Sequence, residues 1–227
     1  MKENSITIEN ISKSYTSTSG LKKKVLDCLS LKIKSGSINI ITGRSGSGKT
    51  TLLNIVSALI NPDSGSVKVG SKEISSLNAS ASDEFRAKHI GYIFQTFNLI
   101  SPLSVRENLY LPSILNGSAD KENPYEKAEN ILRDLGLEEH GDKFPHELSV
   151  GQRQRVAIGR TLFKNPSVVL ADEPTASIDR EAANTVMELF RNLKNDGKTI
   201  IVATHDPLFH EIGPDMVFDI ETKEVAG

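Results

Sequence analysis

Residues 43–50 read GRSGSGKT, and no other segment constrains the fold of this chain as strongly. They match the pattern G-x-x-x-x-G-K-[ST], and they lie between an expected strand, Ser37–Ile41, and an expected helix, Thr50–Ile60. Glycines let consecutive backbone N–H groups turn inward around phosphate oxygens, and the helix adds the positive end of its dipole. A tight strand-to-helix turn without a ligand is the alternative, but the lysine lies where a phosphate would need it. The pattern therefore predicts a phosphate-binding loop.

The roles in this loop follow from the chemistry of ATP with Mg²⁺. Lys49 would neutralise the β- and γ-phosphates, and the Thr50 hydroxyl would ligate Mg²⁺. Arg44 either adds positive charge beside the phosphates or faces solvent. The residues expected at the nucleotide are Gly43, Arg44, Ser45, Gly46, Ser47, Gly48, Lys49, Thr50 and Thr51.

A second constraint is the segment Val168–Pro174, which reads VVLADEP. Its four apolar residues place two carboxylates at the carboxyl end of a buried strand, where ligands of open α/β sheets bind. Asp172 suits Mg²⁺ binding, directly or through water, and Glu173 suits activation of the water that attacks the γ-phosphate. Acidic residues often end a strand without such a role, but the phosphate loop favours the functional interpretation. Together the two segments predict a P-loop nucleoside triphosphatase.

Short β-branched runs alternate with helical stretches, which is typical of an α/β fold with a mainly parallel sheet. The 227 residues suffice for one large domain. We expect residues 1–95 and 163–227 to form the nucleotide-binding core, with an N-terminal antiparallel β subdomain. Residues 96–162 are expected to form an inserted α-helical subdomain, in which Pro112 ends a helix that begins at Val105.

The segment Leu148–Arg155, LSVGQRQR, indicates a further phosphate contact. Ser149 and Gly151 precede an expected helix, so this is a second helix N-terminus with small residues. One nucleotide does not need two such loops on one subunit. The economical interpretation is a head-to-tail dimer, in which this loop covers the ATP bound to a second copy of the chain.

With these motifs the sequence resembles the ATP-binding subunits of ABC transporters, over nearly the whole chain from about residue 6 to residue 220. The resemblance implies that Tyr15 lies under the adenine and that Gln95 senses Mg²⁺ and the γ-phosphate. His205 would contact the γ-phosphate and steady the attacking water. An ordinary strand tyrosine, a solvated strand end and a turn histidine are the respective alternatives.

The resemblance also identifies Leu148–Gln152 as the family signature, with Ser149, Gly151 and Gln152 at the nucleotide of the second copy. Asp179 would lie in a loop that crosses the dimer interface. Val150 departs from the usual signature, which has Gly there. Because Val disfavours positive φ, either the loop differs or the change affects packing only, and the retained neighbours favour packing.

Composition limits the remaining choices. The 27 Lys and Arg against 29 Asp and Glu give a formal net charge of −2 and no case for nucleic-acid binding. The single cysteine, Cys28, excludes an intrachain disulfide framework and is expected to be a small buried residue. Lys22–Lys24 are expected in a solvated hairpin loop, with docking on lipid head groups as the sharper alternative.

No stretch reaches the roughly 18 apolar residues of a membrane helix, and no signal-peptide core follows the N-terminus. A soluble protein is therefore expected, peripheral on the inner face of the cell membrane, with integral membrane permease subunits supplying the span. Residues 92–99, 146–149 and 171–175 look most like the lipoprotein-releasing and macrolide-efflux group. The rival is a soluble ABC-type ATPase of DNA repair or translation, which usually carries a long coiled coil or a second such domain.

Overall fold

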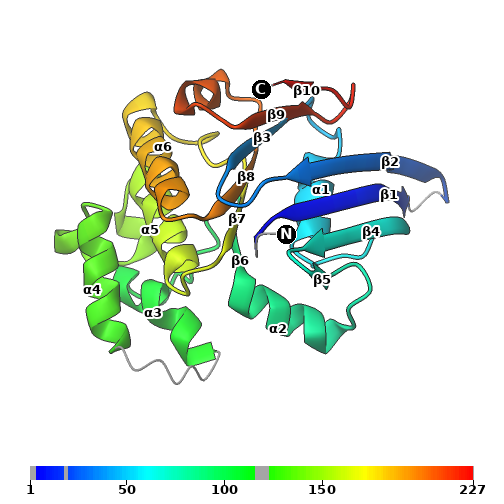
Figure 1. The fold of residues 1–227 in the computed structure, drawn as a ribbon. Coiled ribbons are helices and arrows are strands. Elements are labelled where there is room, and N and C mark those ends of the chain that lie inside the picture. The colour runs from blue at the N-terminus through cyan, green and yellow to red at the C-terminus, as the bar shows by residue number, and fades with distance from the viewer. Residues whose placement is uncertain (1–3, 18–19, 116–122, 227) are drawn as a thin grey trace.

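Two sheets and a set of helices make up the computed structural model, which describes residues 4–17, 20–115 and 123–226. The first sheet is antiparallel, with the order β2-β1-β4-β5. Its strands are β1 (Ile6–Thr16), β2 (Lys22–Ile33), β4 (Ser64–Val69) and β5 (Lys72–Glu73). The N-terminal antiparallel sheet was expected from the sequence, and it lies beside the second sheet in Figure 1.

The second sheet has six strands in the order β10-β9-β3-β8-β7-β6, and only the pairing of β10 with β9 is antiparallel. Its strands are β3 (Ile38–Thr42), β6 (Ile90–Ile93), β7 (Val168–Asp172), β8 (Thr199–Ala203), β9 (Met216–Asp219) and β10 (Val225–Ala226). Every residue of β7 and β8 is buried, as continuous apolar runs predict for strands covered on both faces. The fold is the α/β architecture expected from the sequence.

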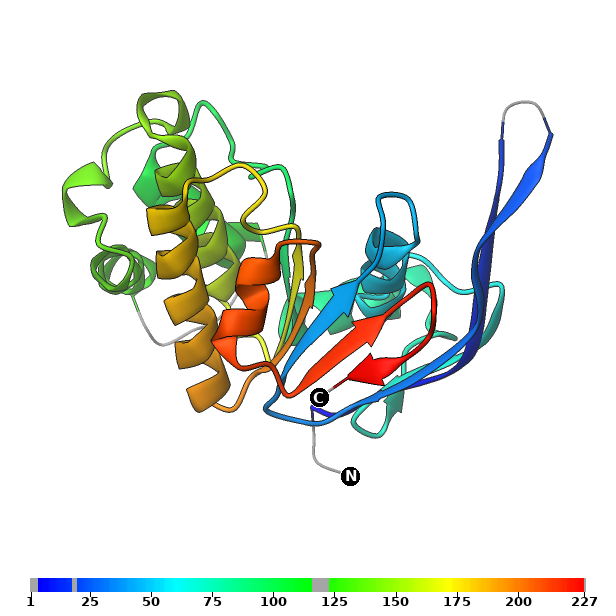
Figure 2. The same ribbon diagram turned by 90° about the horizontal axis from the view of Figure 1, so that it is seen from above.

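Alternate residues of the central strands face two separate cores. Val168 and Leu170 pack in the cluster that contains α1 (Lys49–Val56) and the antiparallel sheet. Val169 and Ala171 pack in the cluster that contains α6 (Arg180–Asn195) and the 3₁₀ helix η3 (Pro207–Ile212). Figure 2 shows α6 and α1 on opposite sides of the sheet.

A third core lies among the helices on the left of Figure 1. It joins α3 (Val105–Leu115), α4 (Pro124–Asp134) and α5 (Val150–Leu162) through Leu109, Leu132 and Val156, among others. Two 3₁₀ turns, η1 (Glu138–His140) and η2 (Pro145–Glu147), connect α4 to α5. We call α3 to α5 the helical region, and the subdomain limits at residues 96 and 162 stay a prediction.

Three helical expectations differ from the structure. The helix α2 (Ala79–His89) was not expected, because only Ser82 and Phe85 of its 11 residues are buried and its apolar stripe is too thin to recognise. Pro112 does not end α3, which continues to Leu115. Proline removes only one hydrogen bond there, and the packed first turns hold the helix. The helix α1 ends at Val56 rather than residue 60, since Ala58 adopts a left-handed φ of 55°.

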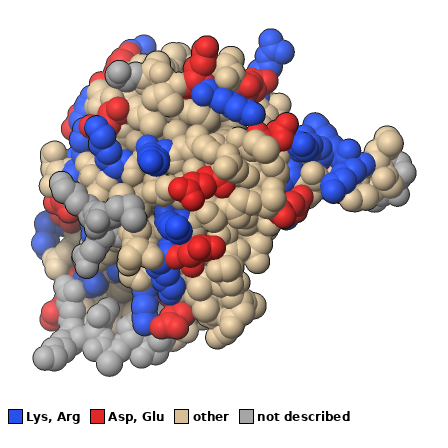
Figure 3. Space-filling model, turned by 45° about the vertical axis from the view of Figure 1, so that its right-hand side comes forward, with Lys and Arg blue, Asp and Glu red and all other residues tan. Residues whose placement is uncertain are grey.

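The β1–β2 hairpin corrects two further expectations. Lys22–Lys24 belong to β2 rather than to a loop, and they are exposed on a hairpin that projects from the molecule (Figure 2). Figure 3 shows basic side chains on this projection. Cys28 is exposed, not buried, because it lies at an irregularity opposite Ser12 and has a φ of 46°. Its N–H donates to the Ser12 hydroxyl at 3.0 Å. In the described part of the chain, no helix is both long and apolar enough to cross a membrane.

Candidate nucleotide-binding site

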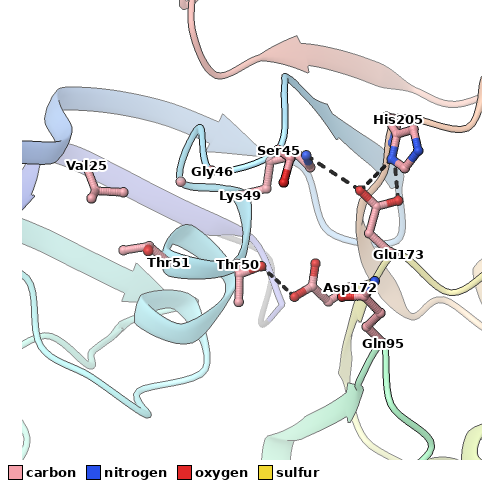
Figure 4. A pocket seen from close by; sticks show the side chains of 11 residues that line it. Val25, Ser45, Gly46, Lys49, Thr50, Thr51, Gln95, Asp172, Glu173 and His205 are labelled. Atoms are coloured by element: carbon pink, nitrogen blue, oxygen red, sulfur yellow. Dashed lines mark hydrogen bonds and ion pairs between the residues drawn. The ribbon is translucent and has the colours of Figure 1, made fainter. Parts of the chain in front are cut away.

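A pocket of about 370 Å³ lies at the carboxyl ends of β3, β7 and β8 (Figure 4). This edge of a parallel sheet is where open α/β proteins bind ligands. The volume falls within the usual range for small-molecule sites. The pocket is lined by Val25, Ser45, Gly46, Gly48, Lys49, Thr50, Thr51, Gln95, Asp172, Glu173 and His205. The structure thus brings the phosphate loop, the acidic strand end, Gln95 and His205 into one site.

The phosphate loop depends on glycine at its last turn before α1. Gly48 has a φ of 107°, and an added Cβ would lie 2.9 Å from a methyl group of Leu26. The loop is also tied to the chain beyond β9, because the Arg44 N–H donates to the Glu221 carboxylate at 2.9 Å. Arg44 itself is exposed, and Gly43, Arg44 and Ser47 do not line the pocket.

Lys49 is buried and crosses the loop. Its ammonium donates to the carbonyl oxygens of Gly43 and Arg44, at 2.8 Å and 3.3 Å, and lies 3.6 Å from Glu173 Oε1. Figure 4 shows the ammonium directed toward the carboxylate. The cation is therefore held at the floor of the pocket between the loop and β7, where it can meet phosphate oxygens.

Thr50 and Asp172 form the part of the site that suits a divalent cation. The Thr50 hydroxyl donates to Asp172 Oδ2 at 2.7 Å, and Gln95 lines the same pocket. Burial raises the pKa of the Asp172 carboxyl, and the Glu173 charge adds to this effect. A bound cation would offset the free-energy cost of keeping this carboxylate ionised. Hydroxyl, carboxylate and carboxamide oxygens are the hard donors that Mg²⁺ prefers, so these residues fit the ion. Among the described residues no cluster of three or more His, Cys, Asp or Glu side chains could hold a metal.

Hydrogen bonds hold both carboxylate oxygens of Glu173 in place. It follows β7 with a left-handed φ of 46°, and its N–H donates to the Ala203 carbonyl at 2.8 Å. Oε1 lies 2.9 Å from His205 Nδ1. Oε2 accepts from the Thr204 hydroxyl at 3.0 Å and from the His205 N–H at 3.4 Å. Residues other than glycine rarely occupy this backbone region, and those that do are often found at functional positions.

Thr204 is a site residue that the sequence analysis missed. Its side chain is 1% exposed, and its hydroxyl also accepts the Asp206 N–H at 3.0 Å. Its position directly before His205, at the end of a buried strand, was the only available signal. The residue joins Glu173 to the turn that carries His205.

The remaining expected site residues lie outside the pocket. Ser149 is the N-cap of α5, where its hydroxyl accepts the Gln152 N–H at 3.2 Å and Gln152 Oε1 accepts the Ser149 N–H at 2.9 Å. Asp179 caps α6 by accepting the Ala182 N–H at 2.8 Å. Tyr15 pairs with Lys23 in the projecting hairpin. None of these residues, nor Gly151, lines the pocket of the same chain.

Val150 occupies the first helical position of α5, and it is not among the described residues with positive φ. The backbone there does not require glycine, as the packing interpretation of this departure expects. Gly151 has a separate requirement, since an added Cβ would lie 2.7 Å from Ala182 Cβ on α6. Small size at Gly151 therefore serves the contact between the two helices.

The segment after Gln95 is held by α5. The Arg160 guanidinium donates to the carbonyl oxygens of Asn98 and Phe97 at 2.6 Å and 3.0 Å. The Arg153 guanidinium lies 5.6 Å from the centre of the Phe97 ring. Burial lowers the pKa of Arg160, which nevertheless stays charged. The helix α5 is thus bonded to residues 97–98, which follow Gln95 of the pocket.

Comparison with known proteins gives consistent matches. The family model described as "ABC transporter" matches residues 26–176. The "ABC transporter ATP-binding protein YtrE" of Bacillus subtilis is 41% identical over 212 residues, which cover 92% of this chain and 91% of that protein. The "Macrolide export ATP-binding/permease protein MacB" of Salmonella typhimurium is 41% identical over 199 residues. That match covers 88% of this chain but only 30% of MacB.

The fold also matches solved structures. One is described as a dimeric structure of a post-hydrolysis state of the ATP-binding cassette MJ0796 bound to ADP and Pi. It has a TM-score of 0.86 and 35% sequence identity, and the match covers 94% of this chain and 93% of that one. A second is a dimeric structure of MJ0796, described as a bacterial ABC transporter cassette, with the same TM-score.

Proposed function

The chain belongs to the ABC transporter family as an ATP-binding subunit, and we propose that it binds ATP with Mg²⁺ in the pocket around Lys49 and hydrolyses it. One observation carries this proposal: Lys49, the Thr50–Asp172 pair and the Glu173–His205 pair share one pocket. These are the groups that neutralise phosphates, hold a hard cation and activate water.

Each group has a distinct task. Lys49 neutralises the β- and γ-phosphates, and the phosphate loop supplies backbone N–H donors. Thr50, Asp172 and Gln95 hold Mg²⁺, which supplies positive charge against the phosphate oxygens when bound. Glu173 accepts the proton of the attacking water, and His205 orients Glu173 and the γ-phosphate.

Two copies of the chain complete the site. The pocket contains none of Ser149, Gly151 and Gln152, and the matched MJ0796 structures are described as dimeric. We propose that these three residues cover the ATP of the second copy, that Asp179 lies at the interface and that Tyr15 contacts the adenine. ATP then stabilises the closed pair, and hydrolysis releases it.

We propose that the dimer, by closing and opening, acts on integral membrane permease subunits at the cytoplasmic face of the membrane. The names of YtrE and MacB support a transporter rather than an ATPase of DNA repair or translation. The likeness to MacB favours the lipoprotein-releasing and macrolide-efflux group. The helical region, with its own core, is proposed as the inserted subdomain that meets the permease.

Substitution of the base tests the proposal. Glu173→Gln should keep ATP binding, lower turnover by about 10² to 10⁴ and accumulate an ATP-bound dimer. Phosphate release measures turnover, and light scattering during size-exclusion chromatography measures the dimer. Glu84→Gln, an exposed carboxylate on α2, is the matched control. A Glu173→Gln variant that hydrolyses ATP at the wild-type rate would refute the assignment of the base.

A further inference from the structure

His140 contacts the signature loop directly. It ends the 3₁₀ turn η1, and its Nε2 lies 2.9 Å from the side-chain nitrogen of Gln152. His140 belongs to none of the sequence motifs. The contact joins the turn after α4 to the first turn of α5.

The hydrogen bonds of Gln152 define which atoms meet in this contact. Gln152 Oε1 accepts the Ser149 N–H, so the carboxamide oxygen faces the start of α5 and the NH₂ group faces His140. The NH₂ group can only donate. His140 Nε2 must therefore be the unprotonated, accepting nitrogen, and the ring proton lies on Nδ1. Nδ1 is buried, and it has no hydrogen-bond partner in the described part of the chain.

The turn that presents His140 is itself well fixed. The His140 N–H donates to the Leu137 carbonyl at 2.9 Å, and the Lys143 N–H donates to the His140 carbonyl at 3.1 Å. The carbonyls of Gly141 and Lys143 accept the first N–H groups of α3, from Arg106 and Val105. The chain that carries the ring is therefore fixed to the N-terminus of α3, and the ring itself contacts the first turn of α5.

We infer that His140 is a positioning residue for the composite ATP site, because it holds the Gln152 carboxamide in the orientation in which its oxygen accepts the Ser149 N–H. The inference rests on the proposed function, in which Ser149 and Gln152 face the nucleotide of the second copy. Without the accepting nitrogen, the Gln152 carboxamide loses one of its two restraints, and the bond that its oxygen accepts from the Ser149 N–H is weakened, while the bond from the Gln152 backbone N–H to the Ser149 hydroxyl remains. His140 does not line the pocket of its own chain, so its effect falls on closure of the dimer rather than on ATP binding by one copy.

Two substitutions of His140 separate this role from packing. His140→Leu removes the acceptor, and His140→Gln keeps an acceptor oxygen on a side chain of similar reach. In a Glu173→Gln background, the Leu variant should need about 10-fold more ATP to form the dimer, because one partly buried donor loses its partner. The Gln variant should dimerise within about threefold of the parent, and Glu139→Gln on the same turn should not differ from it.

Binding of a fluorescent ATP analogue to the monomer should be the same in all these variants. Equal dimerisation of the Leu variant and the parent would overturn the inference, as would equal losses in the Leu and Gln variants. ¹⁵N NMR of the wild-type imidazole gives a test that needs no dimer: the proton should lie on Nδ1, and a proton on Nε2 would overturn the geometry. If the Glu173→Gln parent fails to dimerise with ATP while the proton is on Nδ1, the proposed dimer is refuted and the His140–Gln152 contact stands.

Discussion

Replacement of Thr204 by valine tests whether Glu173, the proposed catalytic base, works only when its carboxylate is held by Thr204. The two side chains have nearly the same shape, so the change removes a hydroxyl without opening a cavity. Thr204 is 1% exposed, and its hydroxyl bonds both Glu173 Oε2 and the Asp206 N–H at 3.0 Å. After the substitution, Oε2 keeps, among the described residues, only the bond from the His205 N–H at 3.4 Å.

The magnitude follows from these two bonds. A hydrogen bond to a charged group contributes about 1.5–3 kcal/mol, which corresponds to roughly 10- to 150-fold in rate if it is needed for alignment of the base. We expect kcat of Thr204→Val to fall by at least about 10-fold. The Asp206 N–H also loses its acceptor, which should lower the free energy of unfolding by about 1–3 kcal/mol. For a chain of this length, that loss corresponds to a Tm decrease of roughly 2–12 °C.

Steady-state phosphate release gives kcat and KM, and differential scanning calorimetry gives Tm. KM should change little, because Thr204 does not line the pocket. Thr204→Ser is the control, since it keeps the hydroxyl and loses only a methyl group, and its kcat should stay within a few-fold of the wild type. A valine variant with wild-type kcat, or a serine variant as slow as valine, would refute the reasoning.

Three further predictions concern the pocket and the signature. ATP at 100 times its Kd should stabilise the wild-type fold by about 2.7 kcal/mol and so raise its Tm. Lys49→Ala should abolish this rise in Tm, and an unchanged thermal shift would exclude Lys49 from binding. Val150→Gly should change the ATPase rate by no more than about a few-fold, because Val150 does not need positive φ; a change beyond about 100-fold would show that the side chain shapes the composite site. Burial raises the pKa of Asp172 above 3.8, so the unfolding free energy of the nucleotide-free protein should fall as pH rises from that value through the raised one. Asp172→Asn should therefore raise Tm at pH 7 while it removes Mg²⁺-dependent turnover, and calorimetry showing a lower Tm would contradict this.

The sequence was sufficient to predict the parts of the fold that have short-range signals. The strands β3, β7 and β8 are mainly apolar, although β3 contains Asn39. In the pattern from Gly43 to Thr50, each glycine has a positive φ and Lys49 has a charge reason. The α/β architecture follows from the alternation of such runs with helices. The helix α2 has no comparable signal, since it buries only two side chains.

The missed details depend on contacts between distant segments. Cys28 follows the strand alternation in sequence, but an irregularity opposite Ser12 turns it outward. Thr204 becomes a site residue only because β8 lies beside β7, which brings its hydroxyl to Glu173. The position of His140 depends on how the turn after α4 packs on α5. Pairings of this kind are set by tertiary structure, and no local pattern encodes them.

The hydrogen bonds of Arg160 to the loop at residues 97–98 couple motion of this loop to the tilt of α5. Ser149 precedes the helix and Arg160 lies near its far end, so the two are separated by about 16 Å along the axis. A tilt of about 10° around the Arg160 end would move Ser149 by about 3 Å, which is more than a hydrogen bond tolerates. A displacement of a few ångströms at the loop beside Gln95 would therefore move Ser149, without a change in the helix itself, and would alter the proposed contact with the nucleotide of the second copy.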